Sequence, residues 1–255
     1  MSNIYDALRS SQGKRLAVTN ELNQQNDEPP PSLPKPRKSK SFTSNPRFHE
    51  ESELLALAQT IATLLPNPNQ RVIQFIGSRE GEGTSTLIRE FALTVTQHSS
   101  KPVLLIEADS NQPSQARAFA MEAKPPLDYV LRDGKPLDGV VSQTEQSNLF
   151  LANLSSNFFR SLTDRSFFHS TDMWKEARNQ FSLILIDSSP VNASTDGLAI
   201  CEFVNGVVLV IAAEKTRSAV AQNVKREILR REGNLLGIVF TKRKFHIPKS
   251  IHKHL

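Results

Sequence analysis

The sequence is poor in cysteine and has no long apolar run. Cys201 is the one cysteine among 255 residues, which excludes an internal disulfide and a cysteine-rich metal site. No apolar run approaches the roughly 18 residues of a membrane-spanning helix, and the N-terminus lacks the apolar stretch of a secretory signal. We therefore expect an intracellular protein that reaches a membrane only through a partner or a charged surface.

Positive charge is concentrated in two segments. Residues 31–48 hold five Lys or Arg and no acid, and residues 225–255 hold nine Lys or Arg against two Glu, whereas residues 49–224 carry 14 basic and 20 acidic residues. Such segments suit an anionic lipid surface or nucleic acid, and they are equally typical of solvated surface without a partner. Nucleic acid is disfavoured because no aromatic or recognition-helix pattern accompanies the charges.

The chain divides into three parts. Residues 1–16 predict a short helix that would be ordered only by docking. Residues 17–48, rich in Pro, Lys and Ser, predict a flexible, disordered linker. Residues 49–255 predict the folded domain, which ends in a basic tail.

Short apolar runs alternate with helical patterns through the folded domain. After an amphipathic helix over 50–65, strands are predicted at 72–76, 103–106, 150–154, 183–186, 207–211 and 235–240, and helices at 84–98, 126–132, 171–180, 195–204 and 216–231. Strands that are apolar on both faces and separated by helices are typical of a parallel sheet covered on both sides. We predict an α/β fold with a doubly wound, mainly parallel sheet.

A glycine-rich loop follows the first predicted strand and precedes a helix. Loops of this kind let main-chain N–H groups converge on phosphate oxygens. The strict phosphate-loop pattern is G-x-x-x-x-G-K-[ST], and here its first glycine is Ser78 and its lysine is Thr84. The predicted nucleotide-contacting residues of the loop are Ser78, Arg79, Gly81, Glu82, Gly83, Thr84, Ser85 and Thr86.

Carboxylates end two later strands. Glu107 and Asp109 follow the strand at 103–106, and Asp187 follows the strand at 183–186. Ligands of open α/β sheets bind beyond the carboxyl ends of the strands, so these three acids and the Ser85 hydroxyl are candidate Mg²⁺ ligands. Each acid taken alone is more often a helix cap. Asp109 and Asp187 are the catalytic candidates if the protein is active.

The order of these motifs resembles the CpsD/CapB-like bacterial tyrosine kinases of capsule and exopolysaccharide synthesis. That family belongs to the MinD/ParA-like (SIMIBI) branch of the phosphate-loop NTPases. The resemblance covers about 50–255, and residues 2–8 and 247–255 are similar to the opening and closing segments of family members. It implies ATP or ADP with Mg²⁺ as ligands, and contacts of Lys215 and Arg217 with nucleotide or a neighbouring subunit.

Four departures from the family pattern point to lost activity. The catalytic lysine falls on Thr84, and the first acid of the second motif is Glu107 instead of Asp. The E-x-x-R-x-x-R oligomerisation motif falls on Glu53, Ala56 and Gln59, and the tail has no tyrosine cluster, since Tyr5 and Tyr129 are the only tyrosines. A cation at the lysine position typically supplies on the order of 10²–10³ in transfer rate, which a neutral threonine cannot replace.

The resemblance and its departures together predict a catalytically deficient regulator of exopolysaccharide polymerisation and export. It would be cytoplasmic and peripheral at the inner face of the bacterial inner membrane. Its expected partners are a Wzz-like membrane polysaccharide co-polymerase, an active kinase or a second copy of itself, and anionic lipid through the basic tail. Two alternatives stay open: a slow ATPase or tyrosine autokinase that uses Arg79 in place of the lysine and modifies Tyr5 or Tyr129, and a ParA/MinD-like positioning ATPase.

Overall fold

The computed structural model describes residues 51–67, 71–110, 112–122, 124–131, 135–146, 148–158 and 173–243. The predicted N-terminal helix, the linker, Tyr5 and the tail beyond residue 243 lie outside these residues, so the three-part division of the chain stays a prediction. Among the described helices, none is long and apolar enough to cross a membrane.

A seven-stranded sheet in the order β3-β4-β2-β5-β1-β6-β7 forms the centre of the described part of the chain. Its strands are β1 (Val72–Gly77), β2 (Val103–Ala108), β3 (Ser142–Gln143), β4 (Leu149–Asn153), β5 (Leu183–Ser188), β6 (Gly206–Ala212) and β7 (Leu235–Thr241). The described neighbours pair in parallel, apart from β3, which is antiparallel to β4. The predicted doubly wound, mainly parallel sheet is confirmed.

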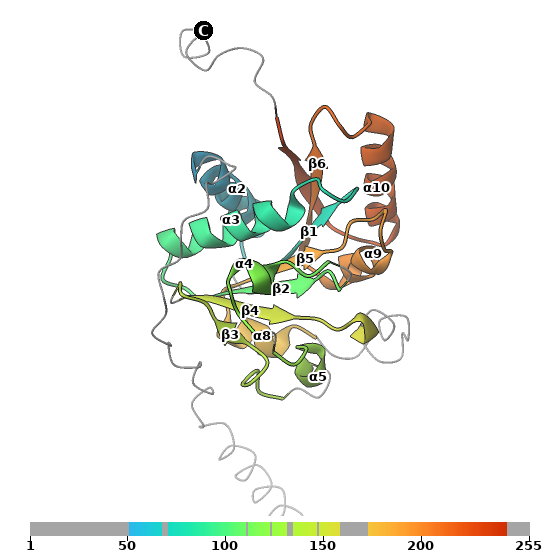
Figure 1. Ribbon diagram of the computed structural model, residues 1–255. Coiled ribbons are helices and arrows are strands. Elements are labelled where there is room, and N and C mark those ends of the chain that lie inside the picture. The colour runs from blue at the N-terminus through green and yellow to red at the C-terminus, as the bar shows by residue number, and fades with distance from the viewer. Residues whose placement is uncertain are drawn as a thin grey trace, which may run out of the picture. The chain divides into compact units, whose positions relative to one another are not determined.

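Helices cover both faces of the sheet (Figure 1). Helices α2 (Glu51–Leu64) and α3 (Thr84–His98) pack on one face, and α8 (Lys175–Gln180), α9 (Asp196–Ile200) and α10 (Ser218–Arg230) pack on the other. The short helices α4 (Gln115–Ala118) and α5 (Asp128–Leu131) follow β2, and the 3₁₀ turn Cys201–Phe203 follows α9.

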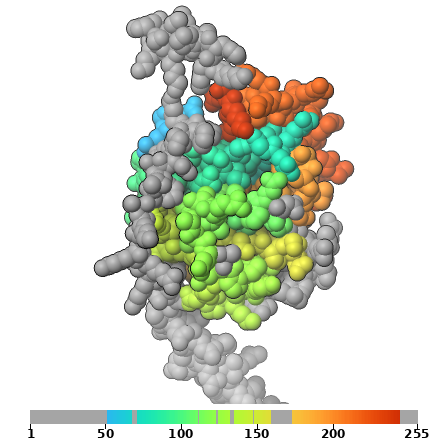
Figure 2. All heavy atoms as spheres, viewed as in Figure 1, coloured from blue at the N-terminus to red at the C-terminus, as the bar shows by residue number. Residues whose placement is uncertain are grey.

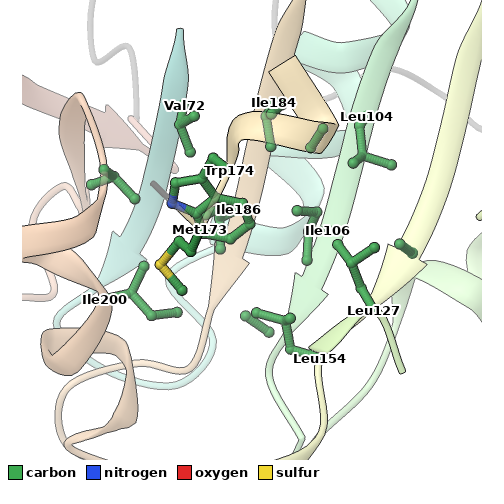
Figure 3. Packing of buried hydrophobic residues seen from close by; sticks show 14 of the residues in the cluster. Val72, Leu104, Ile106, Leu127, Leu154, Met173, Trp174, Ile184, Ile186 and Ile200 are labelled. Carbon is green, nitrogen blue, oxygen red and sulfur yellow. The ribbon is translucent and has the colours of Figure 1, made fainter. Parts of the chain in front are cut away.

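Alternating side chains of the strands form two apolar layers. On β1, Ile73 and Phe75 face α2 and α3, whereas Val72 and Ile76 face the opposite layer. Figure 3 shows Trp174 in that second layer beside Ile184. The indole N–H of Trp174 donates to the Phe203 carbonyl at 2.7 Å, so the polar group of this buried ring is satisfied.

The topology brings the predicted site to one edge of the sheet. β5 lies between β1 and β2, with Asp187 in register with Phe75 on one side and Glu107 on the other. Because these three strands are parallel, the segments that follow their carboxyl ends meet at the same edge. Those segments include the glycine-rich loop and the residues around Asp109 and Ser189.

Candidate functional site

The glycine-rich loop connects β1 to α3. Gly81 and Gly83 have φ angles of 75° and 90°, which lie in the left-handed region that glycine adopts without strain. Helix α3 begins at Thr84, and the N–H groups of its first turn have no helical acceptor. Among the described residues, no acceptor lies opposite the main-chain N–H groups of residues 81–86. These donors are available for an anionic ligand, and the predicted nucleotide contacts of the loop stay a prediction.

The Glu82 side chain turns into the protein and braces the loop. Its carboxylate is buried and accepts hydrogen bonds from Ser78 N at 2.6 Å, Ser78 Oγ at 2.8 Å and Arg79 N at 3.0 Å. It also accepts from the Thr216 hydroxyl and, at 3.4 Å, from the N–H of Ala212 at the end of β6. The side chains of Ser78 and Glu82 are thus engaged with each other, and the predicted ligand contact of Glu82 is limited to its main-chain N–H.

The end of β7 holds the other side of the loop. The Thr241 hydroxyl donates to the Glu82 carbonyl, and the Lys242 ammonium donates to the Gly81 carbonyl. Lys242 has a φ of 55°, a left-handed conformation that is uncommon outside glycine. Lys242 belongs to the basic C-terminal segment of the sequence, and the sequence did not indicate its contact with the loop.

Thr84 stands where the phosphate-loop pattern has its lysine. Its hydroxyl packs back toward the end of β1, since a Cβ added to Gly77 would lie 2.7 Å from Thr84 Oγ1. A cleft of about 270 Å³ opens beside the loop; its lining includes Arg79, Thr84, Ser85, Arg89, Asp109 and Ser188. Figure 2 shows the teal surface of the loop and α3 meeting the green surface of the residues that follow β2.

Asp187 at the end of β5 is buried under the loop. Its Oδ2 accepts a hydrogen bond of 2.7 Å from Gln115 Nε2, and the same amide donates to the Ser85 carbonyl at 2.9 Å. Burial raises the pKa of Asp187 to about 7; hydrogen bonds from Gln115 and Ser85 oppose the shift, and the nearby charges of Glu107 and Asp109 add to it. Oδ1 of Asp187 has no partner among the described residues.

The other two predicted metal ligands have protein partners. Glu107 Oε1 accepts from the N–H groups of Ser114 and, at 2.6 Å, Gln115, so it caps the start of α4. Asp109 Oδ1 accepts from Ser189 Oγ at 2.9 Å and Gln112 N at 3.2 Å.

The acids therefore offer Mg²⁺ a poor site. The described residues contain no group of three or more Asp, Glu, His or Cys that could hold a metal ion. Ser85 and Asp187 lie side by side, but a Gln115 donor occupies one oxygen of the Asp187 carboxylate. Of the four predicted ligands, Glu107 and Asp109 are engaged by protein donors, Ser85 and Oδ1 of Asp187 are the pair left to a metal, and the predicted magnesium site stays a prediction.

The remaining predicted residues lie outside the cleft. Lys215 and Arg217 are exposed and do not line it; Thr216 between them contacts Glu82 instead. Tyr129 on α5 is 59% exposed. The three positions of the oligomerisation motif, Glu53, Ala56 and Gln59, are exposed on α2.

Sequence reasoning missed Gln115 and Arg89. Gln115 is fully buried and links the loop to β5. Arg89 lines the cleft, and its Nη1 donates to Gln115 Oε1 at 3.2 Å. Arg89 lies four positions after Ser85, so the two share one face of α3. That spacing was a signal for Arg89, whereas nothing in the sequence near Gln115 indicates its partners.

Known proteins resemble this chain over most of its folded part. No family model matches it. Tyrosine-protein kinase YwqD of Bacillus subtilis is 26% identical over 175 residues, covering 64% of this chain and 69% of the relative. Tyrosine-protein kinase CpsD of Streptococcus agalactiae is 26% identical over 176 residues, covering 68% and 75%.

Solved structures have the same fold. The crystal structure of the chimerical protein CapA2B2 superposes with a TM-score of 0.65 at 21% identity, covering 76% of this chain and 85% of that one. The resemblance read from the motifs is confirmed: this chain is similar in sequence to CpsD/CapB-like tyrosine kinases and shares the fold of a solved structure of that kind.

Proposed function

We propose that this protein is a nucleotide-binding, catalytically deficient regulator of capsule or exopolysaccharide polymerisation and export. One observation supports this most: the main-chain phosphate cradle is intact, with free N–H groups over residues 81–86, while its lysine position is Thr84. Main-chain donors bind phosphate whatever side chain stands there. Stabilising the charge of phosphoryl transfer requires a cation held against the moving group, and a threonine hydroxyl supplies none.

Different residues of the site would bind the phosphates and hold the loop in shape. The N–H groups of the loop and of the first turn of α3 would accept the terminal phosphates, aided by the helix dipole. Glu82 would keep the loop open by holding Ser78 and Arg79 from beneath. Gln115 would hold Asp187 and the Ser85 carbonyl at a fixed separation. In this arrangement the bound nucleotide acts as a signal and is not turned over.

The partner that we propose is the cytoplasmic part of a Wzz-like polysaccharide co-polymerase. This rests on the resemblance to capsule kinases and on the absence of the two arginines of the oligomerisation motif from the exposed face of α2. Without them, association with a co-polymerase or an active kinase is favoured over a ring of identical copies. The basic tail would add attraction to anionic lipid of about 1 kcal/mol per positioned Lys or Arg.

Calorimetry with ATP and ADP on the wild-type and Thr84→Lys proteins, followed by assays of phosphate incorporation, tests the proposed activity. We expect saturable binding by wild type and tighter binding by Thr84→Lys, because a charge-assisted hydrogen bond contributes about 1.5–3 kcal/mol. Neither protein should phosphorylate itself. Label on Tyr129 in the wild-type protein, lost in Asp187→Asn, would instead establish the autokinase alternative.

Recovery of the protein with membranes that contain the co-polymerase tests the proposed location. Neutralising Lys244, Lys249 and Lys253 should reduce recovery. Lys242 stays unchanged because it contacts the loop. Equal recovery of both proteins would contradict the role of the tail.

A further inference from the structure

Arg89 is a partly buried cation beside the phosphate cradle. It lies one turn along α3 from Ser85 and lines the same cleft. Side chains of a helix lean toward its N-terminus, which here is the phosphate loop. Arg89 and the loop residues that carry the free N–H groups therefore line one and the same cleft.

Most hydrogen-bonding capacity of Arg89 is unused. A guanidinium has five N–H donors, and within the described residues Arg89 makes one hydrogen bond, from Nη1 to Gln115 Oε1. Burial lowers the pKa of Arg89, and the charges of Asp187, Glu90 and Glu107 oppose this shift. An arginine keeps its charge under such conditions, and a partly desolvated charge interacts more strongly with an anion than one in bulk water.

Gln115 fixes this arginine in place and opposes a metal at the same point. Its Oε1 accepts from Arg89 while its Nε2 donates to Asp187 Oδ2 and to the Ser85 carbonyl. A divalent cation beside Ser85 and Asp187 would find Oδ2 of Asp187 occupied by that donor, would have only Oδ1 to bind, and would be repelled by the guanidinium. Positive charge at this end of the cleft is already supplied by the protein.

We propose that Arg89 is the cationic phosphate-binding residue of this cleft and that the protein binds nucleotide phosphates without Mg²⁺. This proposal rests on the nucleotide binding proposed above. It adds which side chain contacts the phosphates and that no metal ion is needed. Guanidinium and phosphate match as a two-point hydrogen-bonded pair, so Arg89 would add a charged contact to bound phosphate, while the lysine position at Thr84, where transfer needs its cation, stays neutral. Arg79 is less suited because its side chain is exposed and solvent screens it.

Calorimetry with ADP and with inorganic tripolyphosphate, each in excess Mg²⁺ and in EDTA, tests the proposal. For wild type we expect dissociation constants in the two conditions to agree within about threefold. Arg89→Gln should weaken both ligands by about tenfold or more, and Arg89→Lys, which keeps the charge and loses the fork, should weaken them less. Arg117→Gln is the matched control, because Arg117 is exposed on α4 and does not line the cleft.

The outcomes separate this proposal from the one on which it rests. Binding that requires Mg²⁺, or that is unchanged in Arg89→Gln, overturns the role of Arg89 and leaves nucleotide binding standing. Absence of binding in either condition overturns both. The comparison of Mg²⁺ with EDTA uses the wild-type chain, so it tests binding without the metal even if a variant fails to fold. Thermal unfolding identifies a variant that fails to fold, and Arg89→Lys then serves as the second test of the arginine.

Discussion

The side-chain amide of Gln115 donates a hydrogen bond of 2.7 Å to Oδ2 of Asp187 and a second, of 2.9 Å, to the Ser85 carbonyl. One neutral side chain thus ties the start of α3 to the end of β5. In a phosphate-loop enzyme this is the region expected to hold a metal ion. Here it holds a hydrogen-bond donor, Gln115, which engages one oxygen of the Asp187 carboxylate.

Replacing Gln115 by Met should destabilise the fold. Methionine keeps much of the volume but leaves Asp187 Oδ2 and the Ser85 carbonyl without their donor, and an unsatisfied buried group costs about 1–3 kcal/mol. Thermal and denaturant unfolding measure the change. Gln112→Met is the control, because Gln112 is exposed and contacts Asp109 through its main chain; equal stability of the two variants would contradict the assigned role.

Asp187 should make stability fall as pH rises. Its pKa in the folded protein, about 7, exceeds the ordinary value of 3.8, so the folded state binds the proton more tightly than the unfolded state. The contribution of this group is fully present below the ordinary pKa and is lost as pH rises toward 7. Arg89, Glu107 and Asp109 are the charged groups that face it.

The variant Asp187→Asn should therefore gain stability relative to wild type at pH 8 and much less at pH 4. Each kcal/mol recovered corresponds to about 2–4 °C in melting temperature for a chain of this size. Melting curves of the ligand-free proteins at the two pH values give the comparison. A variant that is less stable than wild type at pH 8 would show that the carboxylate charge is needed for folding.

Glu82 should be essential to the shape of the loop. Glu82→Gln removes the charge and places an amide N–H₂ among the donors of Ser78, Arg79 and Thr216. We expect a loss of about 2 kcal/mol or more in stability together with weaker nucleotide binding. Glu80→Gln changes an exposed residue of the same loop and should alter neither stability nor nucleotide binding. Similar losses in the two variants would show that the hydrogen bonds of Glu82 are not the cause.

Gly197 should not tolerate a side chain. It begins the close contact between α9 and the end of β5, and an added Cβ would lie 2.8 Å from the Ser189 carbonyl and 2.9 Å from Ile76 Cδ1. Overpacking of this kind costs about 1–3 kcal/mol. Gly237→Ala on β7 is the matched control, because nothing lies within 4 Å of its added Cβ; unfolding midpoints of the two variants should differ clearly.

Short-range patterns made much of the fold and part of the site predictable. The apolar runs indicated the six longer strands, of which β1, β2, β5 and β6 are buried on both faces, β4 nearly so, and β7 only in part. Strand β3 was missed because two residues carry no periodicity. Gly81, Gly83 and Ser85 were found because the loop needs those residue types at that spacing. Lys215 and Arg217 do not line the cleft, so their contact with nucleotide or a neighbouring subunit stays a prediction.

Long-range contacts decided the rest. Gln115 lies 30 positions from Ser85 and 72 from Asp187, and no local pattern can indicate such partners. Likewise, the direction of the Glu82 side chain depends on β6 and the residues after it. Its carboxylate accepts hydrogen bonds from the Ala212 N–H and from the Thr216 hydroxyl. Glu107 was read as a metal ligand because the start of α4, which it caps, has too few residues to be seen in the sequence.

Release of labelled phosphate from ATP by the purified wild-type chain tests most directly whether the site binds without transferring. The assay uses excess Mg²⁺ and an ATP concentration that calorimetry shows to be saturating. We predict no release above that of the Asp187→Asn protein. Magnesium-dependent release by wild type that disappears in Asp187→Asn would contradict a site that binds nucleotide and leaves it intact.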